Sequence, residues 1–224
     1  MINKLKAYWR KLIAFKNLFK IKFLKAKETR YKAKIRKQLN NHDFTIISNN
    51  CWGGRIYEDL GLPYTTPTVG LFFFTPCYIQ FIQNLKRNLE SEVKFIEYSK
   101  YPLGNDLRKS NPYPIGLLNN EIEIHFMHYE TKEKALEKWV RRKERINYKN
   151  LFFSLTDNDL CTLKEIEVFD KLPFKKVFFS AKDITGVNSL VWLKQFESQG
   201  KVGDLYSCPW LYRKYFNVVK WLNG

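Results

Sequence analysis

The sequence predicts an α/β protein: a three-layer α/β/α, Rossmann-like body with a mostly parallel sheet, plus a basic amphipathic N-terminal helix. The body is predicted because short apolar runs alternate with helical stretches, a pattern typical of parallel sheets covered by helices. The helix is set apart by its charge. Residues 1–40 contain 14 of the 39 Lys and Arg residues and a single acidic residue, Glu28. We therefore divide the chain into a basic helical arm (1–40) and an α/β domain (41–224).

The arm is expected to be helical over residues 3–37, which lack Pro and Gly and are rich in Lys, Leu, Ala and Phe. Lysines surround an apolar stripe, a pattern typical of a helix on an anionic membrane surface. The stripe consists of Leu5, Trp9, Leu12, Phe15, Phe19 and Phe23. Two alternatives stay open: a helix packed on the body with a solvated basic face, and a nucleic-acid-binding segment. Nucleic acid is the less favoured partner, since the sequence has no zinc-finger, recognition-helix or RNA-binding motif.

The body alternates predicted strands with predicted helices. Apolar and β-branched runs predict the strands Phe44–Ile47, Val69–Phe74, Val93–Tyr98, Ile122–Tyr129, Leu151–Leu155 and Lys176–Ser180. Apolar residues at helical spacing predict helices over Tyr78–Leu89, after Thr131 as the N-cap, and over Cys161–Asp170. The segment Tyr101–Tyr113 is rich in Pro, Gly, Asn and Asp and predicts an exposed loop.

Cysteine and histidine usage excludes several classes of protein. The 4 Cys residues are far apart and include no CxxC pair, and the chain has only 3 His residues, so we expect neither a metal site nor a disulfide framework. The N-terminus has no uninterrupted apolar core and no small-residue cleavage site, and no stretch reaches the length of a transmembrane helix. A cytoplasmic protein, peripheral on the inner face of the plasma membrane, is therefore expected.

The turn after the first predicted strand, Ser48-Asn-Asn-Cys-Trp-Gly-Gly54, is the candidate site. In α/β proteins, ligands bind and nucleophiles are displayed at the C-terminal ends of strands. Cys51 is the candidate nucleophile and His128 its candidate base. The candidate substrate-binding residues around them are Ser48, Asn49, Asn50, Gly53, Gly54 and His125. The alternatives are a buried, small-hydrophobe role for the cysteine and a core role for His125.

Two groups of charged residues extend the candidate site. Three basic residues at helical spacing suit phosphate or carboxylate groups, unless they form a solvated face. They are Lys138, Arg141 and Arg142, and Arg145 continues the same spacing. Asp157 and Asp159 follow the strand Leu151–Leu155; Asp157 is the candidate to orient the imidazole, and Asp159 to bind substrate. Their spacing also occurs in metal-dependent glycosyltransferases, and a cluster capping a helix explains it equally well.

Six segments of the body carry a resemblance to a known family. They are Ser48-Asn-Asn-Cys-Trp-Gly-Gly54, Thr66-Pro67 with Gly70-Leu-Phe-Phe73, Tyr113-Pro-Ile-Gly116, Ile124-His-Phe-Met-His-Tyr129, Lys138-Trp-Val-Arg-Arg142 and Phe169-Asp-Lys-Leu-Pro-Phe174. Together they resemble the bacterial family called domain of unknown function nineteen-nineteen, commonly labelled exopolysaccharide biosynthesis proteins. The resemblance covers about residues 43–222, with the arm outside it, and implies a Rossmann-like fold and a role in capsule or exopolysaccharide assembly. The strand–Asn–Cys–Gly order is also similar to that of capsule acetyltransferases with a cysteine after the first strand and a His partner.

We therefore expect a membrane-surface transferase of capsular or exopolysaccharide biosynthesis. An acyltransferase that modifies a sugar through Cys51 and His128 ranks above a glycosyltransferase that holds a nucleotide sugar with the Asp157/Asp159 turn and the basic helix. A non-catalytic polysaccharide-assembly protein is the third possibility. No permanently bound cofactor is expected. The expected donor is acetyl-coenzyme A or a nucleotide sugar, and the expected partners are a sugar or lipid-linked saccharide and an anionic membrane surface.

Overall fold

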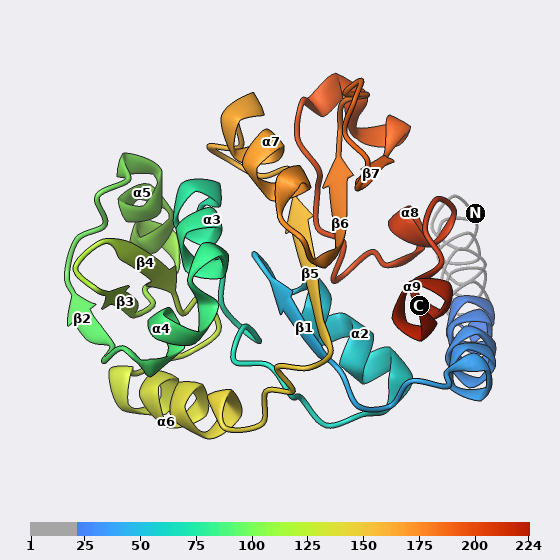
Figure 1. Cartoon of the computed structure of the whole chain (residues 1–224), viewed down its shortest axis with the longest axis horizontal. Helices are drawn as coiled ribbons and strands as arrows, with labels where there is room; N and C mark the ends of the chain where they lie inside the picture. Colours follow the sequence, from blue (N-terminus) through green and yellow to red (C-terminus); the bar gives the residue numbers. More distant parts are fainter. Residues whose placement is uncertain (1–21) are drawn as a thin grey trace, which may run out of the picture.

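The computed structural model describes residues 22–224 and contains two sheets (Figure 1). The larger sheet has four parallel strands in the order β1-β5-β6-β7. They are β1 (Thr45–Ser48), β5 (Leu151–Thr156), β6 (Lys175–Ser180) and β7 (Leu190–Trp192). The smaller sheet is antiparallel, in the order β2-β3-β4. Its strands are β2 (Lys94–Ile96), β3 (Ile115–Leu118) and β4 (Ile122–His125). The chain is thus α/β with a mostly parallel main sheet, which confirms the predicted class.

The strands alternate with short helices and are preceded by a longer one. An N-terminal helix covers residues 22–38. The other helices are α2 (Trp52–Leu60), α3 (Thr75–Gln83), α4 (Leu85–Glu90), α5 (Pro102–Ser110), α6 (Lys132–Lys143), α7 (Leu163–Lys171), the 3-10 helix η1 (Lys194–Gln199), α8 (Trp210–Arg213) and α9 (Val218–Asn223). Figure 1 shows α8 and α9 beside the N-terminal helix, and the small sheet with α5 and α6 at the opposite side of the molecule. No helix within residues 22–224 has the length and apolarity needed to cross a bilayer.

Both faces of the main sheet are covered. Because side chains alternate along a strand, Ile46 and Phe152 enter one core cluster, and Ile47 and Phe153 the other. The first cluster also contains buried side chains of the N-terminal helix, α2, η1, α8 and α9. The second contains those of α3, α4, α6, α7 and the small sheet. The aromatic-rich composition of the chain is therefore explained mainly by two packed cores.

The N-terminal helix is part of the folded body. Ile35 is 5% exposed and packs in the core cluster with α2, α8 and α9. Glu28 forms ion pairs with Arg55 of α2 and Arg213 of α8, each at 2.6 Å. Packing on the body was one of the three alternatives considered for the arm, and residues 22–38 adopt it. Of the apolar stripe expected on the arm, only Phe23 lies within the described residues, and its side chain is 65% exposed.

Two of the predicted segments are wrong. Val69–Phe74 is buried in part but is not a strand: Gly70 has φ +77°, and Phe72 makes only an isolated bridge with His125. The segment Tyr101–Tyr113 is not a loop throughout, because α5 forms there. Pro102 is its first helical residue, a position at which proline favours a helix rather than ending it.

Other predicted elements form with different ends. The predicted helix Tyr78–Leu89 begins at Thr75 and is divided into α3 and α4 at Asn84, whose φ of −129° is not helical. The strand predicted to reach Tyr129 ends at His125. Thr131 caps α6 as predicted, since its hydroxyl accepts a hydrogen bond from the N–H of Lys134 at 3.2 Å. β7 has no counterpart in the prediction.

Candidate functional site

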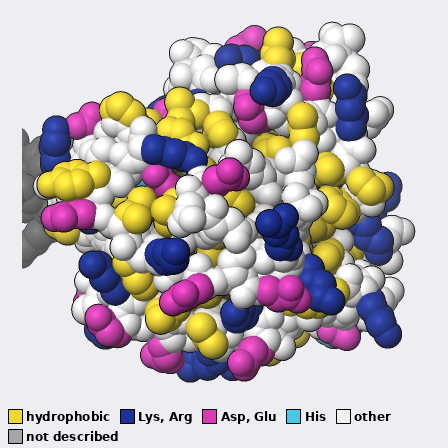
Figure 2. All heavy atoms as spheres, turned by 60° about the vertical axis from the view of Figure 1, so that its left-hand side comes forward, with side chains coloured by type: hydrophobic (Ala, Val, Ile, Leu, Met, Phe, Trp, Pro, Cys, Tyr) yellow, Lys and Arg dark blue, Asp and Glu magenta, His cyan; other side chains and the backbone are white. Residues whose placement is uncertain are grey.

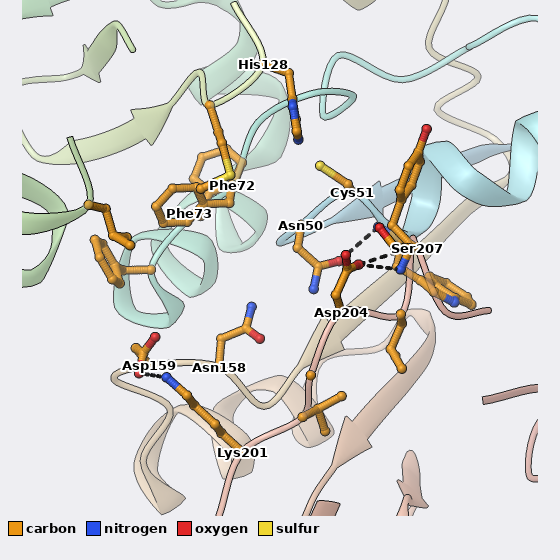
Figure 3. Close-up of a pocket in the computed structure, with 18 residues that line it drawn as sticks. Asn50, Cys51, Phe72, Phe73, His128, Asn158, Asp159, Lys201, Asp204 and Ser207 are labelled. Carbon is orange, nitrogen blue, oxygen red and sulfur yellow. Dashed lines mark hydrogen bonds and ion pairs between the residues drawn. The ribbon is translucent and has the colours of Figure 1, made fainter. Parts of the chain in front are cut away.

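A pocket of about 470 Å³ opens where β1 and β5 end. These strands are parallel neighbours, so their C-terminal ends meet at one edge of the sheet, the position at which α/β proteins bind ligands. Asn50 and Cys51 reach the pocket from the turn after β1, and Asn158 and Asp159 from the turn after β5. Figure 3 shows Phe72 and Phe73 on one side of the pocket and the segment 201–207 opposite them.

Cys51 precedes the first residue of α2 and is half-buried. Its thiol lies 3.9 Å from the carbonyl oxygen of Leu71, the distance of a weak hydrogen bond. Burial raises the pKa of the Cys51 thiol to about 11, and the negative charges of Asp204 and Glu58 act in the same direction. The thiol is therefore protonated at neutral pH. A thiolate activated by nearby positive charge, one form of the nucleophile hypothesis, does not fit these surroundings.

His128 lies beyond the end of β4, in a turn, and its side chain is exposed. Its backbone N–H donates to the carbonyl of Gly70 at 3.1 Å, which ties this turn to the segment that follows β1 and α2. In Figure 3 the imidazole points toward Cys51. Both residues line the pocket, although the whole of the small sheet lies between them in the sequence. The expectation that His128 stands on a strand is wrong, since the strand has already ended.

Asp204 is a pocket residue that the sequence analysis missed. Its carboxylate accepts hydrogen bonds from the N–H groups of Tyr206 at 2.8 Å and Ser207 at 3.0 Å. Burial acts to raise the pKa of Asp204, but hydrogen bonds from Ser207 and Tyr206 and the charge of His128 outweigh it, so the pKa is lowered. This is an Asx turn, and the order Asp-Leu-Tyr-Ser was a possible signal for it.

The three polar residues before Cys51 have different roles. Asn50 lines the pocket, and its Oδ1 accepts from the N–H of Trp52 at 3.0 Å, at the start of α2. Ser48 and Asn49 are fully buried. The Asn49 side chain accepts from the N–H of Thr156 at 2.9 Å and donates to its carbonyl at 3.1 Å, which continues the pairing of β1 and β5 by one step. Ser48 and Asn49 therefore do not line the pocket, and Asn49 holds the ends of β1 and β5 together.

Gly53 and Gly54 serve close packing of α2. A Cβ at Gly53 would lie 3.0 Å from the Cβ of Ser48 and 3.1 Å from a methyl carbon of Ile46. A Cβ at Gly54 would lie 3.4 Å from a methyl carbon of Val69. The first distance is tighter than nearly all real Cβ contacts, so Gly53 lets α2 lie close against β1 without displacing Ser48. The glycines thus place the start of α2 at the pocket.

His125 is fully buried and does not line the pocket. Its Nδ1 lies 3.2 Å from the Tyr113 hydroxyl, and its Nε2 3.4 Å from a carboxylate oxygen of Glu123. The ring stacks on Phe72, with 4.5 Å between ring centroids. Burial lowers the pKa of His125, so the ring is neutral at pH 7. These contacts match the core role that was the alternative to substrate binding.

Asp157 and Asp159 occupy different surroundings. Asp157 is 5% exposed and accepts a hydrogen bond from Ser180 at 3.1 Å, and burial raises its pKa. Asp159 lines the pocket and forms an ion pair with Lys201 at 2.7 Å. The described part of the chain contains no group of three His, Cys, Asp or Glu residues placed to hold a metal ion. The two carboxylates do not converge on one ligand.

A family model described as Domain of unknown function (DUF1919) matches residues 21–223 of the chain. The chain belongs to this family. The match begins at residue 21, so the described part of the N-terminal helix lies within the family domain, whereas the resemblance seen in the sequence started near residue 43. An uncharacterized protein of Haemophilus influenzae strain Rd is similar, with 37% identity over 194 residues that cover 84% of this chain and 88% of the relative.

The basic residues of α6 do not line the pocket of this DUF1919 protein, so the expectation that this helix forms one of its walls is wrong. Lys138 and Arg141 both pair with Glu137, at 3.0 and 3.4 Å. Arg142 donates to the carbonyl of Val69 at 3.0 Å and to the Tyr129 hydroxyl. Figure 2 shows basic and acidic side chains intermixed on the side of the molecule that carries α5 and α6. Arg142 thus supports the two turns beside His128 from outside the pocket.

Proposed function

We propose that this DUF1919 protein is a transferase of capsular or exopolysaccharide biosynthesis that moves an acyl group onto a sugar through Cys51. One observation carries the chemical part: Cys51 and His128 line the same pocket, the imidazole points toward the thiol, and Asp204 lies within electrostatic reach of His128. This is the order of roles in a nucleophile–base–carboxylate triad. The pathway rests on the family resemblance alone.

The surroundings of Cys51 determine how the thiol would react. Because the pKa of Cys51 is raised to about 11, His128 would take the proton as the sulfur attacks, rather than meet a preformed thiolate. The Cys51 S–C bond forms, the C–S bond of a thioester donor breaks, and His128 returns the proton to the leaving thiolate. Asp204 would stabilise the positive imidazole in between. The Oδ1 of Asn50 accepts from Trp52, and its Nδ2 has no hydrogen-bond partner among residues 22–224, so the Nδ2 can donate to the oxyanion.

Glycosyl transfer receives less support from the same geometry. That alternative requires the Asp157/Asp159 turn and the Arg141/Arg142 face to hold one nucleotide sugar. Asp157 is buried against Ser180, and the α6 basic residues lie outside the pocket. The groups expected to bind the phosphates and the sugar therefore do not meet at one place.

A membrane-surface location is part of the proposal. The outward side of the N-terminal helix carries the exposed residues Lys22, Phe23, Arg30, Lys34 and Lys37. Glu28, the one acidic residue of the arm, is turned to the body and paired with two arginines. The exposed side therefore has no negative charge to offset its attraction to anionic lipid.

We also propose that the body is a three-layer, Rossmann-like unit. Helices that pack on both faces of the main sheet support this proposal.

Acylation of Cys51 is the direct test of the chemistry. The full chain is incubated with acetyl-coenzyme A, and the acetyl group is located by peptide mass spectrometry. We expect it on Cys51 in the wild type and not in Cys51→Ala or His128→Ala. Cys208→Ala, which changes another half-buried cysteine, is the matched control and should label normally. Absence of label on Cys51, combined with complementation of polysaccharide structure in cells by Cys51→Ala, would favour a non-catalytic assembly role.

A second experiment tests the membrane part. Sedimentation with vesicles of phosphatidylglycerol and phosphatidylcholine should bring down the full chain. The variant Arg30→Glu/Lys34→Glu/Lys37→Glu should sediment much less, and the proposal fails if it sediments equally. Glu28 is left in place so that the fold is preserved.

A further inference from the structure

The charges of the pocket are unequal. The Asp, Glu, Lys and Arg residues of its lining are Asp159, Lys201 and Asp204. Lys201 is already paired with Asp159 at 2.7 Å, at the end of the pocket away from His128 (Figure 3). Asp204 has no Lys or Arg partner among the ion pairs of the described residues and keeps its charge, because its pKa is lowered. Apart from His128, whose charge acts on Asp204, the lining therefore carries one net negative charge, on Asp204 near the reacting end of the pocket.

Neighbouring residues increase this effect. Glu58 acts on Cys51 with the same sign as Asp204. Its carboxylate is held in place by hydroxyl donors, Tyr64 and Tyr206, each at 2.9 Å. Arg55, the guanidinium of α2, donates to the carbonyl of Tyr206 in the pocket lining, but its positive charge is balanced by ion pairs with buried Asp59 and half-buried Glu28. An anionic group at Cys51 would therefore be repelled, and a cationic group attracted.

The rest of the lining suits a sugar ring. Half-buried Phe72 and Tyr206 offer aromatic surface, and Asn50, Asn158 and Ser207 offer hydrogen-bond donors and acceptors. Such a combination of apolar faces and polar groups is what a saccharide, with its CH face and hydroxyl rim, requires.

We infer that the acceptor is an amino sugar whose amine binds as an ammonium group at Asp204, beside Cys51. The transfer of an acyl group rests on the proposed function. The choice of an amine as its acceptor rests on the charge of the pocket. In the transfer step, the nitrogen attacks the acyl carbon, the N–C bond forms and the C–S bond to Cys51 breaks. Of the three ammonium protons, one remains on the amide, one reaches the Cys51 sulfur through His128, and one leaves to solvent. The product is an N-acylated sugar and a free thiol.

The test compares three trisaccharides of different charge. They are the glucosamine trimer (cationic), the N-acetylglucosamine trimer (neutral) and the galacturonate trimer (anionic). Binding to the full chain at pH 7 is followed by NMR titration at low ionic strength. Because Asp204 is exposed, we expect a moderate preference, about fivefold for the cationic over the neutral ligand, with the anionic ligand weakest. The preference should decrease as salt is added, since it depends on charge.

Asp204→Asn keeps the side chain that an Asx turn requires and removes only the charge. We expect it to lower the affinity for the glucosamine trimer about fivefold and to leave the neutral ligand unchanged. Asp106→Asn, at an exposed position on α5, is the matched control and should change neither. The inference is overturned if the galacturonate trimer binds as tightly as the glucosamine trimer, or if Asp204→Asn weakens all three ligands equally.

The acylation experiment separates this inference from the function on which it rests. An amine preference without acetylation of Cys51 would overturn acyl transfer and support the amine site. Acetylated Cys51 without an amine preference would overturn the amine site and support acyl transfer.

Discussion

Asp59 is the centre of the ion-pair network that joins the N-terminal helix to the body. We predict that neutralising its carboxylate strongly destabilises the fold. The side chain is 0% exposed. Its carboxylate lies 2.8 Å from Arg55, 2.7 Å from Arg213 and 3.2 Å from Lys32. In Asp59→Asn, three cations are left around a neutral amide, with only Glu28 to balance them.

Breaking a buried ion pair by removing one partner costs about 3–5 kcal/mol, because the remaining charge has lost its solvation and gained no partner. We therefore expect Asp59→Asn to lower the free energy of unfolding by about 3 kcal/mol or more. Urea denaturation followed by circular dichroism measures it. Asp106→Asn removes an acid from an exposed pair with Lys109 at 2.7 Å, and should change the free energy of unfolding little.

Acid provides an independent check on the same network. The hydrogen bond and charge of Arg213 outweigh burial and hold the pKa of Glu28 below its ordinary value of 4.5. The pair therefore contributes its full stability above that pH, and the contribution is lost as the pH falls through the lowered pKa of the folded state.

The reasoning is refuted if Asp59→Asn lowers the free energy of unfolding by less than about 1 kcal/mol, the range of exposed pairs, because the network would then be effectively solvated.

Three further predictions concern the pocket and its surroundings. Alkylation of Cys51 by iodoacetamide, followed by peptide mass spectrometry, should be slow at neutral pH and accelerate up to a pKa of about 11; rapid reaction at pH 7 would contradict the protonated thiol. Gly53→Ala should lower the free energy of unfolding by about 1–3 kcal/mol through its contact with Ser48, whereas Gly54→Ala, with ordinary contacts, should be close to neutral; equal effects would show that α2 can shift. The folded state should lose stability as the pH falls below 6.5, because buried His125 stays neutral while the unfolded chain takes up the proton; His125→Gln should remove this part of the pH dependence, and an unchanged profile would assign it elsewhere.

The strands of the main sheet were predictable because their signal is local. The apolar runs around Phe153 and Phe178 are buried on both sides and belong to central strands, which such runs are typical of. The run around Phe72 has the same composition but does not find a strand partner beyond the bridge to His125. Gly70 turns the chain just before Phe72, and α3 begins three residues after it. The extended segment between them is therefore too short to pair as a strand. Composition alone does not contain this difference.

The candidate site was predictable on one side only. The turn containing Cys51 has a local signature, a strand followed by polar residues and two glycines, and this turn lines the pocket. The opposite side, including Asp204, comes from a segment about 150 residues away with a short Asx turn as its only mark. The basic side chains of α6 misled the prediction. Helical spacing shows that these charges lie on one side of the helix, but it does not show which part of the protein that side faces. Arg142 points to the backbone of Val69, a contact that only the tertiary structure determines.

The contacts of Glu28 also decide how the arm can be studied. Arg55, which pairs with Glu28, donates a further hydrogen bond to the carbonyl of Tyr206 at 3.0 Å, on the segment that lines the pocket. A truncation that begins at residue 41 would therefore remove Glu28 and Ile35 together, and would disturb the pocket as well as any lipid-binding surface. Loss of activity in such a fragment would not separate targeting from catalysis. Shortened chains meant to separate them must keep residues 22–40. Charge reversal on the outward side of the N-terminal helix separates them better, because it leaves these contacts in place.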